Sequence, residues 1–133
     1  MGIDTKQIIE YWKYHSAYDL ETAGSLFNSD RYPYCLFMAH QAIEKLLKAQ
    51  IVKITRDHAP YGHNLLRLAE LSKLPFSREQ IERLAEITEF NLKARYDDYL
   101  SKFHKKCTKE YTENYFTIAK ELYLWIKDQL EKN

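Results

Sequence analysis

Glycine and proline are scarce in this sequence, with three of each among 133 residues. Tight turns depend on these two residues, so the chain has few positions for the many reversals of an all-β fold. It also lacks an apolar run of about eighteen residues, and its charged N-terminal stretch does not have the pattern of a signal peptide. We therefore expect a helical, cytoplasmic protein that does not enter a membrane.

A strong excess of charge is missing as well. Twenty basic residues against nineteen acidic ones leave a net charge of +1, which excludes a generally basic surface but leaves room for local basic clusters. Cys35 and Cys107 have neither a CxxC partner nor an adjacent His, so we expect reduced, buried thiols. Phosphate-binding glycine motifs are absent too. We expect no cofactor and no metal.

The strongest pattern that is present lies in residues 34–56. Apolar residues recur there every three or four positions, which is the spacing of a helix, and Pro33 suits a first helical turn. We expect this helix to be the central and most buried one. Beside its apolar stripe runs a polar one, which comprises Gln41, Glu44, Lys45 and Lys48.

Long helices are also expected at both ends of the chain. Asp4 can cap the first, which extends to about Asn28 and lies antiparallel to the central helix across a short turn. The last is expected from about Thr108 to Glu131, where apolar residues keep the same spacing. The inward-facing residues of the first helix are expected to be Ile8, Trp12, Ala17, Leu20, Ala23 and Phe27.

Two shorter helices are expected in the middle of the chain. One covers residues 63–71, with His63 at its cap. Ser77 and Gln80 have the spacing of a capping box, which predicts another helix to about Phe90. The inward-facing residues of this helix are expected to be Ile81, Leu84, Ala85 and Thr88.

Residues 91–106 are highly charged and lack a sustained apolar stripe. Because Asp97 and Asp98 are also unfavourable inside a helix, an interrupted, exposed connection is expected there. The sequence thus predicts one all-α domain over residues 1–133. Its five helices form a largely antiparallel, up-and-down bundle with two long helices first, two shorter ones next and a long one last.

Arg95 and Tyr96 are the main binding candidates. Arginine presents a planar fork that matches phosphate, and an adjacent tyrosine can stack on a base. Lys45 and Lys48 would add positive potential if the fold brought them near. The alternative for all four residues is that they are solvated surface groups.

His40 and Glu44 stand four apart on the central helix, the spacing at which two side chains share a proton or a metal ion. A zinc protease motif would need a second histidine in this helix, so a hydrogen-bonded pair is the favoured interpretation. Asp97, Asp98 and His104 offer a weak divalent-ion pattern, for which hydrated surface charges are the simpler explanation.

Four segments taken together resemble a known family. The sequence is similar to a HEPN domain in WKYHSAYDLETAGSLF at 12–27, AHQAIEKLLKA at 39–49, GHNLLRL at 62–68 and ARYDDY at 94–99. The resemblance implies a five-helix bundle, often dimeric, that binds nucleotides and accompanies a small nucleotidyltransferase in two-gene toxin–antitoxin modules. Its other motif positions correspond here to Gln41, Glu44, His63 and Asp98.

One branch of that family consists of metal-independent ribonucleases with an Arg, four to six residues and then a His. Here eight residues separate Arg95 from His104, and Asp97 stands where the family signature has Pro. The leading hypothesis is therefore a homodimeric protein that binds a nucleotide or RNA phosphate and is the partner of a nucleotidyltransferase. The alternatives are a divergent ribonuclease that uses Arg95 and His104, and a non-catalytic dimeric scaffold that uses its many tyrosines as an interface.

Overall fold

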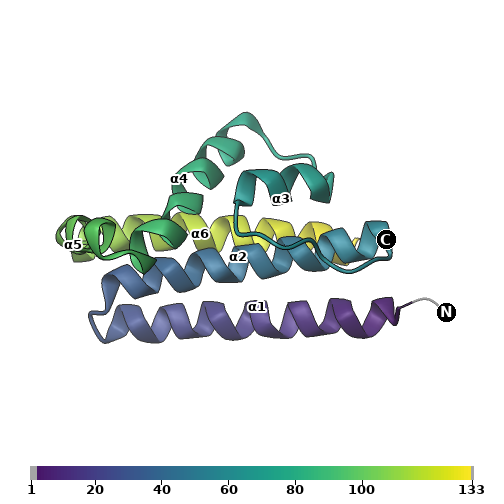
Figure 1. Ribbon diagram of the computed structural model, residues 1–133, viewed down its shortest axis with the longest axis horizontal. Coiled ribbons are helices and arrows are strands. Elements are labelled where there is room, and N and C mark those ends of the chain that lie inside the picture. The colour runs from purple at the N-terminus through teal and green to yellow at the C-terminus, as the bar shows by residue number, and fades with distance from the viewer. Residues whose placement is uncertain (1–2, 133) are drawn as a thin grey trace.

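Six helices make up most of the chain in the computed structural model, which describes residues 3–132 and, for residues 97–100, the backbone alone (Figure 1). The described residues contain no strand, so the all-α prediction is confirmed. No helix among them is long and apolar enough to cross a membrane. The helices are α1 (Thr5–Asn28), α2 (Tyr32–Thr55), α3 (Leu65–Ser72), α4 (Arg78–Arg95), α5 (Asp97–Lys106) and α6 (Lys109–Glu131).

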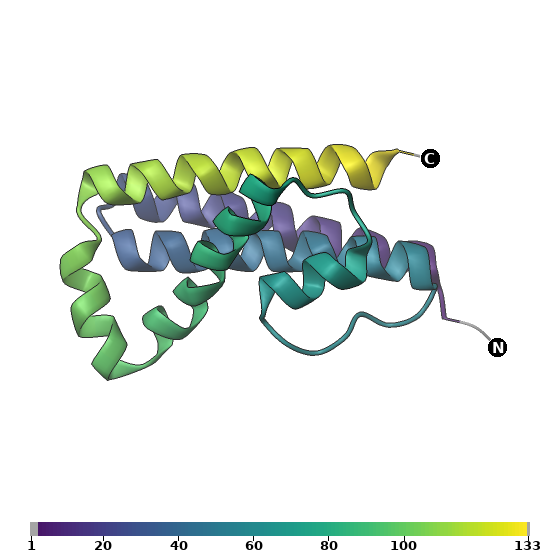
Figure 2. The same cartoon turned by 90° about the horizontal axis from the view of Figure 1, so that it is seen from above.

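The central position predicted for the second helix is confirmed. α2 is buried along most of its length, and α1, α3, α4 and α6 all pack on it (Figures 1 and 2). α1 and α2 are antiparallel neighbours, joined by a short turn in which Asp30 has a φ of 62°. α6 returns along α2, while α3 and α4 form a second layer over it (Figure 2).

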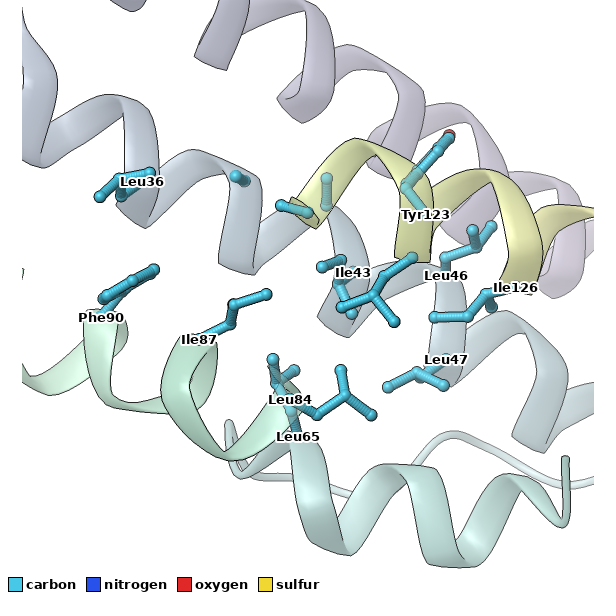
Figure 3. Close-up of a cluster of buried hydrophobic side chains, with 14 of the residues drawn as sticks. Leu36, Ile43, Leu46, Leu47, Leu65, Leu84, Ile87, Phe90, Tyr123 and Ile126 are labelled. Carbon is cyan, nitrogen blue, oxygen red and sulfur yellow. The ribbon is translucent and has the colours of Figure 1, made fainter. Parts of the chain in front are cut away.

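The hydrophobic core lies where α2 meets α4 and α6. Figure 3 shows Ile43 and Leu47 of α2 grouped with Leu84 and Ile87 of α4 and Ile126 of α6, and each of these side chains is 0% exposed. Burying an aliphatic side chain of this size contributes about 1.5–3 kcal/mol. The core therefore holds the second layer firmly on α2.

The predicted inward face of α1 needs correction. Ala17 is exposed, whereas Ser16 and Asp19 are buried. Asp19 is accommodated because its Oδ2 lies 2.6 Å from Nζ of Lys45 on α2, and a buried charge needs such a partner. Apolar spacing alone did not reveal this polar contact between the helices.

The predicted inward face of α4 is also partly wrong. Leu84 is buried as expected, but Ile81 is 38% exposed, and the other buried positions include Ile87 and Phe90. The buried face of α4 therefore runs through Leu84, Ile87 and Phe90, so the helix is rotated about its axis relative to the prediction. Its capping box is present as predicted, since the Ser77 side chain accepts from the backbone of Gln80 and the reciprocal bond also forms.

Residues 91–106 form helix instead of the predicted exposed connection. α4 continues to Arg95, the extended backbone of Tyr96 interrupts the helix, and α5 begins at the next residue. The apolar residues of this segment are few but well placed. Phe103 is 2% exposed, its ring centroid lies 5.4 Å from that of Phe90, and Cys107 is buried as well. Tertiary packing therefore outweighs the poor helix propensity of the aspartates.

Candidate functional site

A network of polar side chains is buried beside α2. Glu44 is only 3% exposed, and each of its two carboxylate oxygens contacts a different side chain. Lys48 Nζ donates to its Oε2 at 3.2 Å, and Nδ1 of His63 lies 2.9 Å from its Oε1. The Lys48 ammonium also lies 5.4 Å from the ring centroid of Trp12 on α1. Glu44 thereby joins α1, α2 and the loop before α3.

His40 extends this network on the other side of Glu44. It is fully buried, and its Nε2 donates to the backbone carbonyl oxygen of His63 at 3.0 Å. Its Nδ1 lies 3.2 Å from Oε1 of Gln41, and this oxygen accepts from Nδ2 of Asn91 on α4 at 3.2 Å. Burial lowers the pKa of His40, so its imidazole is neutral at neutral pH. The network thus reaches from the loop before α3 to the last turns of α4.

The prediction that His63 caps the third helix is wrong. Asn64 holds that position, because its side chain accepts from the backbone N–H groups of Leu66 and Arg67. The imidazole of His63 instead contacts the carboxylate of Glu44. An acidic partner on α2 competes successfully for the imidazole, while asparagine is the better capping residue.

The neutral state of His40 makes stability depend on pH. Its pKa is lowered from 6.5 on folding, so the unfolded chain takes up a proton that the folded protein excludes. This contribution is fully present above pH 6.5 and is lost as the pH falls below it, by at most about 1.4 kcal/mol per pH unit. Denaturant unfolding from about pH 7.5 to about pH 5.0 should show a steeper loss for the unmodified protein than for His40→Gln. Equal slopes would contradict this assignment.

Asn91 connects the network to the predicted binding residues. Arg95 lies one helical turn after Asn91 and is the last residue of α4. The hydrogen bond between Asn91 and Gln41 therefore ties the part of α4 that carries Arg95 to α2. Nothing in the sequence pattern marked Asn91 as important, because its role depends on a glutamine fifty positions away.

Arg95 and Tyr96 lie at the corner between α4 and α5, here termed the α4–α5 corner. Arg95 is exposed, and Tyr96 is 56% exposed with an extended backbone that separates the two helices. The last turn of α5 is basic, in accord with the negative end of the helix dipole. The exposed basic residues of α5 are Lys102, His104, Lys105 and Lys106.

Lys45 and Lys48 are paired with carboxylates away from the α4–α5 corner. Lys45 is paired with Asp19 of α1 at 2.6 Å, and Lys48 is 7% exposed and paired with Glu44. Both ammonium groups thus already have carboxylate partners inside the bundle. The structure does not bring either lysine to Arg95, so we exclude them from the α4–α5 corner.

The remaining predicted site residues fall into separate places. Gln41, Glu44 and His63 meet in the buried network, while the side chain of Asp98 is outside the described part of the chain. His104 lies in the last turn of α5, about 10 Å along the helix axis from its first residue. Arg95 and His104 are therefore at opposite ends of α5 within one chain.

Neither cysteine has the properties of a nucleophile. Both are unpaired and buried, and burial raises the pKa of Cys35 and of Cys107 to about 12. A thiol needs a lowered pKa and access to solvent for reactivity. They serve as small apolar residues, as the sequence predicted.

The fold and the network define a class of protein: an α-helical bundle domain in which a buried polar network supports an exposed basic corner. A family model described as "HEPN domain" matches residues 9–129. Since the match covers most of the sequence, the chain belongs to the HEPN family. A search of curated proteins gives no match to this sequence.

Two solved structures share this fold. The crystal structure of TT1696 from Thermus thermophilus superposes with a TM-score of 0.74 at 20% identity and covers 90% of this chain and 96% of its own. The crystal structure of ST0689, described as an archaeal HEPN homologue, gives a TM-score of 0.69 at 16% identity and covers 92% and 98%, respectively. At these identities the likeness concerns the fold alone.

Proposed function

We propose that this HEPN protein binds the phosphate of a nucleotide or of RNA at the α4–α5 corner. The Arg95 guanidinium offers two parallel N–H donors to phosphate oxygens, and the ring of Tyr96 offers a surface on which a base stacks. Lys102, Lys105 and Lys106 increase the positive potential along α5. The protein would then present its ligand to a small nucleotidyltransferase partner.

The observation that carries this proposal is the joint exposure of Arg95 and Tyr96 at the break between two helices. A side chain that only supported the fold would be packed or paired, as Lys45 and Lys48 are. Asn91 and its buried contacts hold the end of α4 in place, so the guanidinium is carried on a rigid element. Rigid placement lowers the entropy lost on binding.

The partner in this proposal comes from the family and not from the geometry. Family resemblance implies a two-gene toxin–antitoxin-type module in which the HEPN chain accompanies a nucleotidyltransferase. Co-purification of this protein with a nucleotidyltransferase encoded by the neighbouring gene tests the proposed partnership. If a stable complex forms equally well with Arg95→Ala, while that variant binds no RNA, partner binding and phosphate binding use separate surfaces.

Arg95→Ala is expected to weaken binding of labelled single-stranded RNA or ATP about tenfold or more, because charge-assisted hydrogen bonds contribute about 1.5–3 kcal/mol. For RNA, the slope of log affinity against log salt should fall by about 0.7 for one lost phosphate contact. Fluorescence anisotropy over a salt series measures both quantities. Arg78→Ala is the matched control, since Arg78 lies at the other end of α4 with a 95% exposed side chain.

Unchanged affinity in Arg95→Ala would contradict the site. The same RNA, incubated with chelator, tests the ribonuclease alternative, which requires cleavage by the unmodified protein and its loss in both Arg95→Ala and His104→Ala. Because α5 separates these two residues in one chain, we expect binding without cleavage.

A further inference from the structure

Residues 56–63, here termed the α2–α3 connection, run back along α2. The connection begins at Arg56, where the helix ends, and its last residue, His63, contacts Glu44 and His40 earlier in the same helix. These two contacts lie about 18 and 24 Å from Arg56 along the helix axis. Eight residues reach at most about 26–29 Å when fully extended. The connection therefore uses most of its length to cover this distance and has little slack.

The side chains of the connection fall into two groups. Ala59 and Pro60 are half-buried, whereas Arg56, His58 and Tyr61 are exposed. The exposed fraction of Tyr61 is 103%, so its ring touches almost nothing in the chain. A tyrosine ring is a large apolar surface that is normally packed on something. Contacts within the protein thus do not explain why a tyrosine stands at this position.

Basic residues gather where the connection begins. A pocket of about 300 Å³ lies there between the first turns of α1 and the last turns of α2 and α6. The charged residues of its lining are Lys6, Lys13, Lys53, Arg56, Glu10 and Glu131. Lys13 is paired with Glu10 at 3.7 Å, but Lys6 and Arg56 form no ion pair with a described side chain of residues 3–132. Positive charge therefore prevails at this end of the connection.

The α2–α3 connection and the α4–α5 corner lie on the same side of α2, the side away from α6 (Figure 2). Each presents an exposed arginine together with an exposed tyrosine, Arg56 with Tyr61 and Arg95 with Tyr96. Like Arg56, Arg95 forms no ion pair with the described side chains. The same two chemical groups thus occur twice on one side of the molecule.

The buried network fixes the separation between these two places. The carbonyl oxygen of His63 accepts from His40, and the neighbouring Gln41 accepts from Asn91, one turn before the α4–α5 corner. Gln41 and Arg56 are fifteen positions apart on α2, which is about 22 Å along its axis. A strand with stacked bases advances about 3.4 Å per nucleotide, so about seven nucleotides cover this distance.

We propose that one RNA strand of about seven or more nucleotides binds along this side of α2, from the α4–α5 corner to the α2–α3 connection. Arg56 binds a phosphate of the strand, Tyr61 stacks on a base, and Lys6 adds positive potential. This binding mode depends on phosphate binding at the α4–α5 corner and specifies the ligand, because a free nucleotide reaches only one of the two arginines. A strand is favoured as the occupant because its phosphates repeat, so that one molecule meets both arginines.

The dependence of affinity on strand length tests this proposal. Fluorescence anisotropy compares end-labelled single-stranded RNAs of four and of twelve nucleotides on the full chain. Four nucleotides cover about 14 Å and cannot reach both arginines. We expect the twelve-nucleotide strand to bind about a hundredfold tighter or more, since linked contacts gain about 10²–10⁴-fold, whereas the larger number of binding registers alone gives about tenfold at most.

Variants of the connection identify the second contact. Tyr61→Ala should weaken binding of the twelve-nucleotide strand about fivefold or more, while Tyr61→Phe, which keeps the ring, should bind like the unmodified protein. Arg56→Gln keeps the length of the side chain and removes its charge, so the slope of log affinity against log salt should fall by about 0.7. Neither Tyr61→Ala nor Arg56→Gln should change binding of the four-nucleotide strand, which the α4–α5 corner holds.

Two exposed residues outside the proposed path provide matched controls. Tyr14→Ala removes a tyrosine of α1 that is 65% exposed, and Arg78→Gln neutralises an arginine at the far end of α4 whose side chain is 95% exposed. Both should bind the two strands like the unmodified protein. Circular dichroism should show the same helix content for all variants, because every altered side chain is exposed.

Failure of this inference can be told apart from failure of the phosphate site. If Arg95→Ala weakens binding of both strands while Arg56→Gln and Tyr61→Ala weaken neither, the corner binds phosphate but the strand does not follow α2. A twelve-nucleotide strand that binds less than about tenfold tighter than the short one would also overturn the inference, since registers alone explain that gain. Unchanged binding of both strands in Arg95→Ala would instead remove the corner site and this inference with it.

Discussion

Replacing Glu44 with alanine is expected to lower the free energy of unfolding by about 3–5 kcal/mol, the cost of leaving a buried charge without its partner. Lys48 is only 7% exposed, and Glu44 is the carboxylate that neutralises it at 3.2 Å. His63 loses its contact with the same carboxylate at 2.9 Å. The substitution therefore weakens the attachment of α1 and of the loop before α3 to α2.

Urea denaturation followed by circular dichroism measures this loss. Glu82→Ala is the matched control, because Glu82 forms an exposed ion pair with Arg78 at 3.6 Å, and such pairs contribute about 0–1 kcal/mol. Combining Glu44→Ala with Lys48→Met should recover part of the lost stability, since the unpaired buried ammonium is then gone. A loss for Glu44→Ala as small as that of the control would show that the network is not buried in solution.

Leu84→Ala is expected to cost about 2–5 kcal/mol, the range for deleting a fully buried leucine side chain. Leu84 is 0% exposed, and Figure 3 shows it among side chains of α2 and α3, including Leu47 and Leu65. The rigid core around it limits collapse into the vacated space. Because Leu84 belongs to α4, its loss also loosens the helix that carries Arg95.

Ile81→Ala is the control for this prediction, and it tests the orientation of α4 at the same time. Apolar spacing placed both residues on the inward face, but Ile81 is 38% exposed. Its truncation should therefore cost less than about 1 kcal/mol. Comparable losses for the two variants in urea denaturation would contradict the rotation of α4 seen in the structure.

The helices themselves could be predicted from the sequence because the signals that start and bury them are local. Asp4 and Ser77 accept from backbone N–H groups three residues ahead, as expected of the caps predicted there, and Thr108, the predicted start of the last helix, does the same. The dense apolar pattern of residues 34–56 likewise identified the helix with the most neighbours. Residues 91–106 were mispredicted because their helix depends on Phe103 packing against Phe90 and not on local propensity.

The candidate site, too, could be predicted only in part from the sequence. The sequence by itself determined that a guanidinium and an aromatic ring are adjacent, and that His40, Glu44 and Lys48 share one side of a helix through four-residue spacing. Only the tertiary structure decided which carboxylate each lysine meets. It also decided that His63 faces Glu44 and that Asn91 links α4 to α2, because hydrogen bonds between distant residues depend on how the helices are packed.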